Sequence, residues 1–258
     1  MPDFLDRLAR DAKETLAKGY YTSSKKETDR LVSLKLAIAQ CRKTPVISEV
    51  KAASPSTGII RENVEPEKLA HAMVRGGAVG VSVLTEPVHF NGSLENLRRV
   101  RQAVNVPVLM KDIIISPKQL VTASRIGANA VLLIQSIFDR GYCQQSLPQM
   151  INYAHASNLE VLLETHNADE FRRAVTSEAD MVGINNRDLA TLMVDLKITK
   201  RILKRNATND KIVVSESGIC EPADLLFLRE CGAQAFLIGS AVMFANEVET
   251  KVREFVNA

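Results

Sequence analysis

The sequence predicts an α/β fold, a single (β/α)8 (TIM) barrel with an N-terminal helical extension. Eight short apolar, β-rich runs follow one another from residue 45 onward, and segments of helical periodicity separate them. Consecutive strands that run parallel need a crossover connection of this kind between them. Eight strand–helix units joined by short links match a closed barrel. An open doubly wound sheet fits less well, because no GxGxxG motif follows the first run and polar residues end nearly every run.

Residues 1–44 form the predicted N-terminal helical extension, within one domain of residues 1–258. A first helix, ended by Gly19, is indicated by apolar residues at helical spacing, namely Phe4, Leu5, Leu8, Ala12 and Leu16. Ser24 and Glu27 then fit a capping box, in which each side chain satisfies a backbone donor at the start of a helix. We therefore expect a second helix from there to about Gln40.

Eight strands and eight helices are predicted after this extension. The predicted strands are 45–50, 79–84, 106–110, 130–134, 159–163, 180–184, 211–215 and 235–238. The predicted helices are 66–77, 93–104, 117–127, 145–157, 168–176, 195–205, 221–231 and 245–256. Several of these helices end in glycine, as at Gly127 and Gly232, which is a normal stop signal.

The composition excludes several classes of function. The chain has 258 residues, 46% of them hydrophobic, which is enough for a sizeable core. A net charge of +3 gives weak support to an anionic substrate, and the basic residues do not cluster as nucleic-acid binding requires. No apolar stretch approaches a membrane span, and residues 1–19 lack the apolar core of a signal peptide. We therefore expect a cytoplasmic protein that binds neither nucleic acid nor membrane.

The cysteines and histidines predict no metal site. The four cysteines form no CxxC pair, and the four histidines form no HExxH or similar group. We interpret the cysteines as reduced thiols of a cytosolic protein. His89 and His166 come close to strand ends, and we interpret both as structural bystanders.

Charged and polar residues follow most of the predicted strands. They are Glu49 and Lys51, Lys111 and Asp112, Glu164, Asn185, Asn186 and Arg187, and Glu216. One such charge is usually a solvated edge, but strand ends converge at the C-terminal rim of a barrel, where active sites lie. Three carboxylates and two lysines on four strands therefore favour a shared pocket. A lysine near other cations or in a dry mouth can become a usable general acid.

Two small dipeptides predict a phosphate site. Ser217-Gly218 follows the seventh strand and Gly239-Ser240 follows the eighth, which are the two loops that often hold phosphate in barrels. Ser54 after the first strand adds a hydroxyl. Each dipeptide alone is an ordinary turn, whereas together they favour phosphate. Phe90, in a loop after the second strand, is interpreted as an aromatic lid or a staple, and Leu132 as core or the floor of a pocket.

Eight stretches resemble one family, the indole-3-glycerol-phosphate synthases of tryptophan biosynthesis. They occur in family order and span the chain, and they read PVISEVKAASPSTG, SVLTE…FNGSLENL, PVLMKDIII, GANAVLLI, VLLETHN, VGINNRDLATLMVDL, VVSESGI and FLIGSAVM. The resemblance implies a carbon–carbon lyase that works without a cofactor. Its substrate would be 1-(2-carboxyphenylamino)-1-deoxyribulose 5-phosphate, which closes a ring, loses carbon dioxide and loses water.

The resemblance also implies roles for individual residues. Lys111 would be the general acid of ring closure, Lys51 would contact the carboxylate and act as acid in the dehydration, and Glu49 would be the base or its partner. Glu164 would stabilise the cation that develops near the ring nitrogen or assist proton transfer. The remaining assignments are Asn185 and Glu216 to substrate hydroxyls, Arg187 to the carboxylate, Phe90 and Leu132 to the anthranilate ring, and Ser54, Ser217, Gly218, Gly239 and Ser240 to the phosphate.

Four positions depart from the family pattern. The family commonly has arginine at Ala52 and lysine at Thr57, and it often has phenylalanine at Ile113 and aspartate at Ser116. These residues lie beside the proposed acids and bases rather than among them. We expect the changes to affect the first loop and substrate affinity.

Other functions remain open on the residues alone. A phosphate-binding isomerase such as phosphoribosylanthranilate isomerase would need a cysteine at the end of the first strand, where Glu49 and Lys51 stand instead. A Schiff-base aldolase could use Lys51 or Lys111. A non-catalytic barrel that binds phosphorylated metabolites is the third alternative. We expect a monomer, and contacts with other tryptophan-pathway enzymes are left open.

Overall fold

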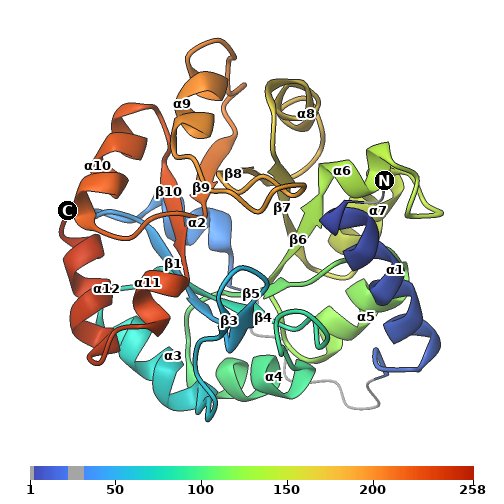
Figure 1. Ribbon diagram of the computed structural model, residues 1–258, viewed down its shortest axis with the longest axis horizontal. Coiled ribbons are helices and arrows are strands. Elements are labelled where there is room, and N and C mark those ends of the chain that lie inside the picture. Colours follow the sequence, from blue (N-terminus) through green and yellow to red (C-terminus); the bar gives the residue numbers. More distant parts are fainter. Residues whose placement is uncertain (1–2, 23–31) are drawn as a thin grey trace.

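The computed structural model describes residues 3–22 and 32–258, and it confirms the predicted barrel (Figure 1). The barrel strands are β1 (Val46–Val50), β4 (Gly80–Leu84), β5 (Val108–Lys111), β6 (Ala130–Ile134), β7 (Glu160–Thr165), β8 (Met181–Asn185), β9 (Ile212–Glu216) and β10 (Ala235–Ile238). Neighbours in this order pair in parallel, and β1 pairs with both β4 and β10, which closes the barrel. Each predicted strand corresponds to one of these eight.

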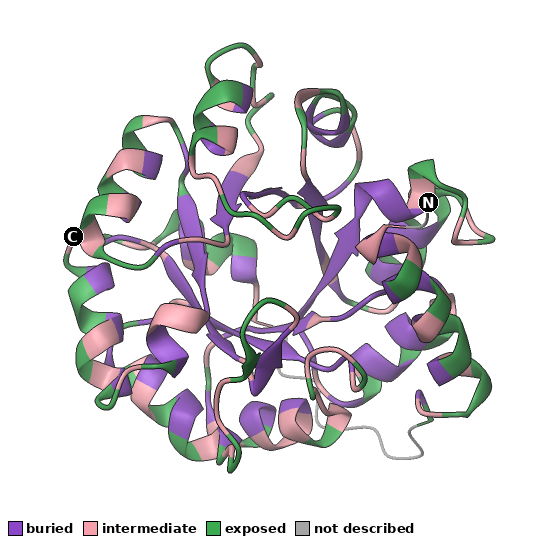
Figure 2. Cartoon of the chain, viewed as in Figure 1, coloured by how far each residue is buried: buried purple, intermediate pink, exposed green. Residues whose placement is uncertain are grey.

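Helices cover the outside of the barrel. Those that follow a strand in the predicted alternation are α3 (Pro66–Arg75), α4 (Leu94–Ala103), α5 (Pro117–Arg125), α7 (Leu147–Ala156), α8 (Ala168–Ala174), α9 (Lys197–Leu203), α10 (Pro222–Glu230) and α12 (Val248–Val256). Their buried residues face the strands (Figure 2). Side-chain caps fix several starts: Ser116 and Gln119 form a capping box on α5, and Ser146 and Gln149 form another on α7.

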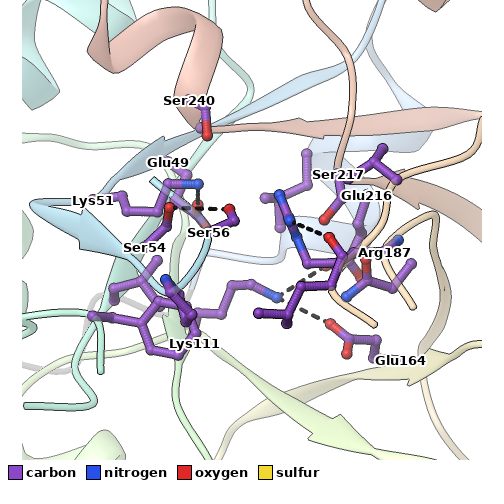
Figure 3. A pocket seen from close by; sticks show the side chains of 18 of the residues that line it. Glu49, Lys51, Ser54, Ser56, Lys111, Glu164, Arg187, Glu216, Ser217 and Ser240 are labelled. Atoms are coloured by element: carbon purple, nitrogen blue, oxygen red, sulfur yellow. Dashed lines mark hydrogen bonds and ion pairs between the residues drawn. The ribbon is translucent and has the colours of Figure 1, made fainter. Parts of the chain in front are cut away.

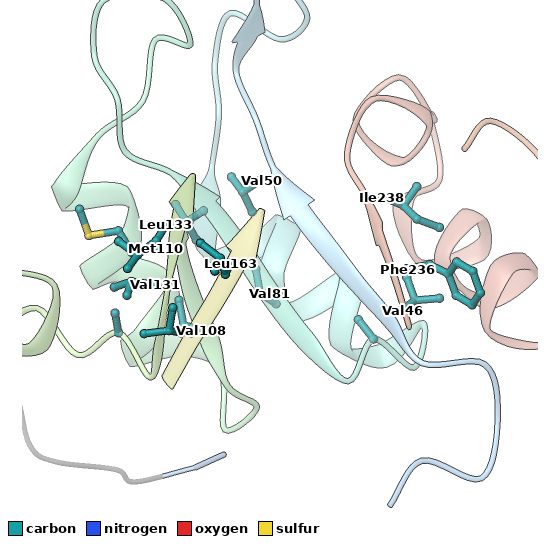
Figure 4. Packing of buried hydrophobic residues seen from close by; sticks show 14 of the residues in the cluster. Val46, Val50, Val81, Val108, Met110, Val131, Leu133, Leu163, Phe236 and Ile238 are labelled. Atoms are coloured by element: carbon teal, nitrogen blue, oxygen red, sulfur yellow. The ribbon is translucent and has the colours of Figure 1, made fainter. Parts of the chain in front are cut away.

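Alternation along each strand divides the core in two. Outward-facing residues such as Val46, Val81 and Val108 pack under the helices (Figure 4). Inward-facing residues such as Ile47 and Leu109 fill the lower part of the barrel. The interior is therefore packed with aliphatic side chains below the charged ends of the strands.

The two N-terminal helices pack at opposite ends of the barrel. Helix α1 (Phe4–Ala17) buries Leu5 and Leu8 in the same cluster as the inward-facing strand residues. Helix α2 (Leu34–Ala39) lies at the other end, because Glu160, the first residue of β7, accepts hydrogen bonds from Ser33 Oγ and the Leu34 amide. The Leu34 side chain also packs so closely on Gly80 that a methyl group there would overlap it.

The start of the second helix differs from the prediction. Residues 32 and 33 are not helical, and Ser33 is the N-cap whose side chain accepts from the Leu36 amide. The expected capping box of Ser24 and Glu27 lies outside the described residues. The shorter helix follows from the strong cap at Ser33, which Glu160 reinforces from β7.

Three further elements were not predicted. A two-stranded antiparallel hairpin of β2 (Ala53–Ser54) and β3 (Gly58–Ile59) follows β1, and short helices α6 (Gln135–Asp139) and α11 (Ser240–Met243) follow β6 and β10 directly. All three lie at the carboxyl ends of strands, where loops build a site. Within residues 3–22 and 32–258, no helix has the length and apolar character needed to cross a membrane.

Candidate active site

A cavity of ≈ 370 Å³ opens at the carboxyl ends of the barrel strands (Figure 3). The structure brings all fourteen predicted site residues to its walls, namely Glu49, Lys51, Ser54, Phe90, Lys111, Leu132, Glu164, Asn185, Arg187, Glu216, Ser217, Gly218, Gly239 and Ser240. They come from every barrel strand or the loop after it. The sequence prediction that these residues share one pocket is therefore met, whereas their individual roles stay predictions.

Glu49 and Lys51 form an ion pair on the wall built by β1. Glu49 Oε1 lies 3.2 Å from Lys51 Nζ, and the Glu49 side chain is only 4% exposed. Gly239, at the end of the neighbouring strand β10, makes room for this pair, because a Cβ atom there would overlap Glu49 Oε1 and crowd Lys51 Nζ. A glycine assigned to phosphate from the sequence thus also has a steric role.

Lys111 is held between two buried carboxylates. Its Nζ lies 3.1 Å from Glu164 Oε2 and 3.1 Å from Glu216 Oε2, so β5, β7 and β9 meet at this ammonium group. Burial lowers the pKa of Lys111, but the charges of the two glutamates outweigh burial and hold that pKa above its ordinary value. The nearest charges to this lysine are therefore carboxylates and not other cations.

The two carboxylates beside Lys111 titrate differently. Burial raises the pKa of Glu216 to about 7, and the nearby negative charge of Glu164 acts in the same direction, against the effect of Lys111. At Glu164 burial also raises the pKa, but Lys111, His166 and the Asn185 amide together hold it well below its usual range. One proton is therefore available at Glu216 near neutrality while Glu164 stays ionised.

Asn185 is the last residue of β8, and Arg187 lies in the loop directly after it. The Asn185 Oδ1 accepts a hydrogen bond of 2.9 Å from the Arg187 amide, which fixes the turn after the strand. The Arg187 guanidinium donates to the Leu192 carbonyl at 2.8 Å, and burial lowers the pKa of Arg187. Arg187 thus presents a cation to the cavity. Its backbone pairs with that of Val194, so the short loop between them folds back on itself.

Hydroxyl groups and turns form the part of the cavity assigned to phosphate. Ser54 lies in the hairpin after β1, and its hydroxyl is 3.5 Å from that of Ser56. Ser217 and Gly218 both have positive φ, of 68° and 86°, and a Cβ on Gly218 would overlap Val194. Figure 3 shows Ser240 on the side of the cavity away from Glu164. These hydroxyl groups and turns come from the loops after β1, β9 and β10.

The apolar wall includes residues that the sequence prediction missed. Phe90 and Leu132 line the cavity as expected, and α1 adds Phe4 and Leu8. Phe4 packs edge-to-face on His89, with ring centroids 5.4 Å apart, and His89 Nε2 lies 2.7 Å from Asp11 Oδ2. The amphipathic pattern of the first helix was a signal for burial, but nothing in it indicated which end of the barrel it covers.

Two buried acids hold the loops that carry site residues. The Glu86 carboxylate accepts from the amides of Val88, His89 and Phe90, at 2.7–3.1 Å. Asp112 accepts from the Tyr21 hydroxyl at 2.9 Å and from Thr85 Oγ1 at 2.5 Å. Burial raises the pKa of Asp112 to about 6 despite these hydrogen bonds. Both acids line the cavity; Asp112 was among the charged strand-end residues noted in the sequence but received no role, and Glu86 was not noted.

His166 contacts the site and is not a bystander. Its Nε2 lies 3.2 Å from Glu164 Oε1 and its Nδ1 lies 3.5 Å from Glu170 Oε2. These are ion-pair distances, and neither ring nitrogen forms a hydrogen bond within the described residues. The side chain is 11% exposed. Its position near a strand end was visible in the sequence, but its contacts with two carboxylates were not.

The positions that depart from the family pattern lie at the edge of the site. Ile113 is buried and lines the cavity, whereas Ser116 is the N-cap of α5, a function that serine and aspartate both perform. Ala52 is buried in the loop after β1, and Thr57 is exposed at the tip of the hairpin but lines the cavity. The two absent basic residues therefore concern the first loop, as expected.

Comparisons with known proteins agree with this geometry. Residues 6–255 match the family model described as indole-3-glycerol phosphate synthase. A relative of that description from Methanocaldococcus jannaschii is 44% identical over 234 residues, covering 89% of this chain and 85% of its own. Another from Acetivibrio thermocellus is 42% identical, covering 81% and 79%.

Solved structures of lower identity share the fold. The N-acetylmannosamine-6-phosphate 2-epimerase of Clostridium perfringens superposes with a TM-score of 0.62 at 13% identity, covering 83% of this chain and 93% of that one. A thiamine phosphate pyrophosphorylase of Pyrococcus furiosus gives 0.60 at 18% identity, covering 86% and 96%. At these identities the likeness concerns the barrel alone.

Proposed function

The chain belongs to the indole-3-glycerol phosphate synthase family, and from that premise we propose how its side chains divide the reaction. The activity is that of a carbon–carbon lyase in tryptophan biosynthesis. The substrate 1-(2-carboxyphenylamino)-1-deoxyribulose 5-phosphate closes a ring with loss of carbon dioxide and water. Such a reaction needs a proton donor at the ketone oxygen, stabilisation of a cationic ring and an acid and base for the dehydration.

Lys111 is the proposed general acid of ring closure. The ring carbon attacks the carbonyl carbon, and the carbonyl oxygen takes a proton from the Lys111 ammonium. The raised pKa keeps this proton on the nitrogen until a stronger base develops next to it. An acid in place is worth about 10²–10⁴ in rate.

Glu164 is the proposed stabiliser of the ring cation. Ring closure leaves positive charge on the anthranilate nitrogen and ring until carbon dioxide departs. A carboxylate that stays ionised in a buried site interacts strongly with such a charge. Glu164 meets this requirement because Lys111 and His166 keep its pKa low.

Lys51 and Glu49 are the proposed pair for the dehydration. The leaving hydroxyl needs an acid and the ring proton needs a base, and the two groups stand 3.2 Å apart on one wall. Lys51 also lies where it can contact the substrate carboxylate before decarboxylation. This assignment places the two proton donations on different lysines and the proton removal on Glu49.

The other residues of the cavity are proposed to bind the substrate. Arg187 contacts the carboxylate, and Asn185 and Glu216 hold the hydroxyls. Phe90 and Leu132 enclose the anthranilate ring. The phosphate is assigned to Ser54, Ser217, Gly218, Gly239 and Ser240, whose hydroxyls and turns line the cavity from the loops after β1, β9 and β10. The substrate spans the cavity with its ring and phosphate apart.

The contact of Lys111 with two carboxylates carries this proposal most directly. Its test is a pH–rate profile of the wild type beside single variants of Lys111, Lys51, Glu49 and Glu164, with the fluorescence of the indole product as the signal. If a variant loses the acidic or the alkaline limb of the pH–rate profile, the proton transfer that causes this limb is assigned to the replaced residue. A purified wild type that binds the substrate and never produces the signal would instead support the binding-only alternative, and borohydride trapping would reveal a Schiff-base aldolase.

We also propose that residues 1–258 form one domain that works as a cytoplasmic monomer. All four cysteines are free, which suits a reducing compartment. Sedimentation equilibrium of the purified chain tests the monomer, because a dimer would double the mass. Association with other enzymes of tryptophan biosynthesis is not needed for any step above, since every proposed group comes from this chain.

A further inference from the structure

A buried histidine stands behind Glu164, on the side away from Lys111. Oxygen Oε2 of Glu164 faces Lys111, while Oε1 lies 3.2 Å from His166 Nε2. The imidazole in turn lies 3.5 Å from Glu170, on the first turn of α8. The carboxylate of Glu164 therefore has one cationic neighbour in the cavity and a second in the wall.

Glu170 is fixed more firmly than a solvated acid would be. Its Oε1 accepts from Ser136 Oγ at 3.0 Å and from Asn167 Nδ2 at 2.6 Å, and its Oε2 accepts from the His166 amide at 2.8 Å. The residue is 7% exposed. These contacts come from α6, the α8 cap and the strand end, and among the described residues the His166 ring is the one cationic group at ion-pair distance from Glu170.

The groups form a row of alternating charge through the barrel wall. In order from the cavity they are Glu216, Lys111, Glu164, His166 and Glu170. From the loop after β8, Asp188 also experiences the charge of His166. Burial lowers the pKa of His166, but Glu164 and Glu170 outweigh burial and raise it to about 9. The ring is thus an imidazolium at neutral pH.

The need for this second cation follows from the proposed role of Lys111. Once Lys111 has given its proton to the carbonyl oxygen, the amine is neutral, and Glu164 and Glu216 lose the charge that lay between them. Two neighbouring buried carboxylates cannot both stay ionised without a cation, and the charge of His166 favours the state in which Glu216 takes the proton and Glu164 keeps its charge. At that moment the ring cation forms and an ionised Glu164 is needed.

We propose that His166 and Glu170 are a positioning pair that keeps Glu164 ionised and oriented while Lys111 is deprotonated. This rests on the proposed function, in which Glu164 stabilises the ring cation. Neither His166 nor Glu170 touches the substrate. Glu170 keeps the imidazole charged, and the imidazolium keeps the proton off Glu164.

The decisive variant is Glu170→Gln, which removes the charge and keeps the shape. We expect kcat to fall about tenfold or more with KM nearly unchanged, since the loss concerns an intermediate and not binding. The alkaline limb of kcat should also move to lower pH by about one unit or more, because an opposite charge at this distance shifts a pKa by about 1–3 units. The matched control is Asp169→Asn, an exposed acid one residue away on the same helix, which should change neither quantity.

A readout without turnover accompanies these kinetics. NMR titration should give His166 a pKa above the ordinary value of a histidine in the wild type, and a lower one in Glu170→Gln. His166→Asn assigns the signal and supplies a second variant if Glu170→Gln fails to fold. A Glu170→Gln protein that loses thermal stability but retains kcat, its pH profile and the His166 pKa would overturn the proposal.

The variant Glu164→Gln distinguishes a failure of this inference from a failure of the proposed function on which it rests. If Glu164→Gln retains full kcat, the role of Glu164 itself is wrong, and the positioning pair has nothing to position. If Glu164→Gln loses activity while Glu170→Gln and His166→Asn behave like Asp169→Asn, the function stands and only the positioning pair is wrong. The inference holds if all three site variants lose kcat and the exposed control does not.

Discussion

Lys111 Nζ lies 3.1 Å from Glu164 Oε2, although 53 residues separate the two along the chain. The contact exists because β5 and β7 direct both side chains to the interior at the same level of a closed barrel. In the proposed reaction one partner gives a proton and the other stabilises the cation that results. Their contact links the first chemical step to the second.

Replacement of Lys111 by alanine is expected to nearly abolish turnover. Loss of a general acid should lower kcat by about 10²-fold or more. Circular dichroism should show an intact barrel, since the side chain comes from a strand end and its backbone pairing is unaffected. Lys118→Ala is the matched control, because Lys118 is exposed on the helix that follows. Near-normal rates in Lys111→Ala would remove lysine-assisted ring closure.

Glu216 should make the folded protein lose stability as pH rises from about 4.5 to about 7. Its pKa is about 7 in the folded protein against a usual value of 4.5, so the folded state binds more protons in this window. The free energy of unfolding should fall by about 3 kcal/mol across it from this residue. Denaturant titrations of wild type and Glu216→Gln at several pH values measure the difference.

The control for that measurement is Glu230→Gln, an exposed acid at the end of α10. Its unfolding curve should follow the wild type at every pH. A Glu216→Gln protein whose stability has the same pH dependence as the wild type would mean that Glu216 is already ionised near pH 5.

Gly239→Ala should damage catalysis more than folding. The backbone φ of Gly239 is −113°, which alanine adopts freely, so the effect comes from the added methyl group against Glu49 and Lys51. Displacement of a catalytic pair by about 1 Å can cost about 10²-fold in rate, and we expect kcat/KM to fall about tenfold or more.

Gly232→Ala is the contrasting variant. Gly232 has φ +105°, and its nearest neighbour is 3.7 Å from an added Cβ, so alanine there brings backbone strain and no overlap. It should lower Tm and keep kcat/KM. If both glycine variants changed Tm and activity in the same proportion, the steric explanation for Gly239 would be wrong.

Phe4→Ala tests the contribution of α1 to binding. The ring lines the cavity and packs on His89, so its removal opens the apolar wall at the mouth. We expect KM to rise about tenfold, equivalent to about 1.4 kcal/mol of binding, with a smaller change in kcat. Tyr153→Ala removes an aromatic ring that is 49% exposed on α7, and KM should then be unchanged.

The sequence was sufficient to predict which residues share the cavity. Strand alternation placed Glu49 and Lys51 on one face, and convergence of strand ends brought in Lys111, Glu164 and Glu216. The partners within that set were not predictable. Which carboxylate faces Lys111 depends on the tilt and closure of the barrel, and these depend on all eight strands together.

Residues contributed by other elements escaped prediction for a related reason. Helical periodicity showed that Phe4 and Leu8 are buried but not against which end of the barrel. His166 looked like an isolated ring, because Glu170 approaches it only once α8 has packed on the barrel. The second helix starts at Leu34, because Glu160, more than 120 residues away in sequence, supports its N-cap Ser33.

Within residues 3–22 and 32–258, the packed lower interior and α2 fill the end of the barrel opposite the cavity, so molecules reach the site through the mouth at the carboxyl ends of the strands. Incoming substrate, departing carbon dioxide and water, and the finished indole compound all share it. Substrate and product must therefore occupy the site in turn. Substrate cannot enter through the packed lower end of the barrel while a product still fills the mouth of the cavity. Each turnover then includes the time that the product needs to leave the cavity. Accumulated product competes directly with new substrate for the site.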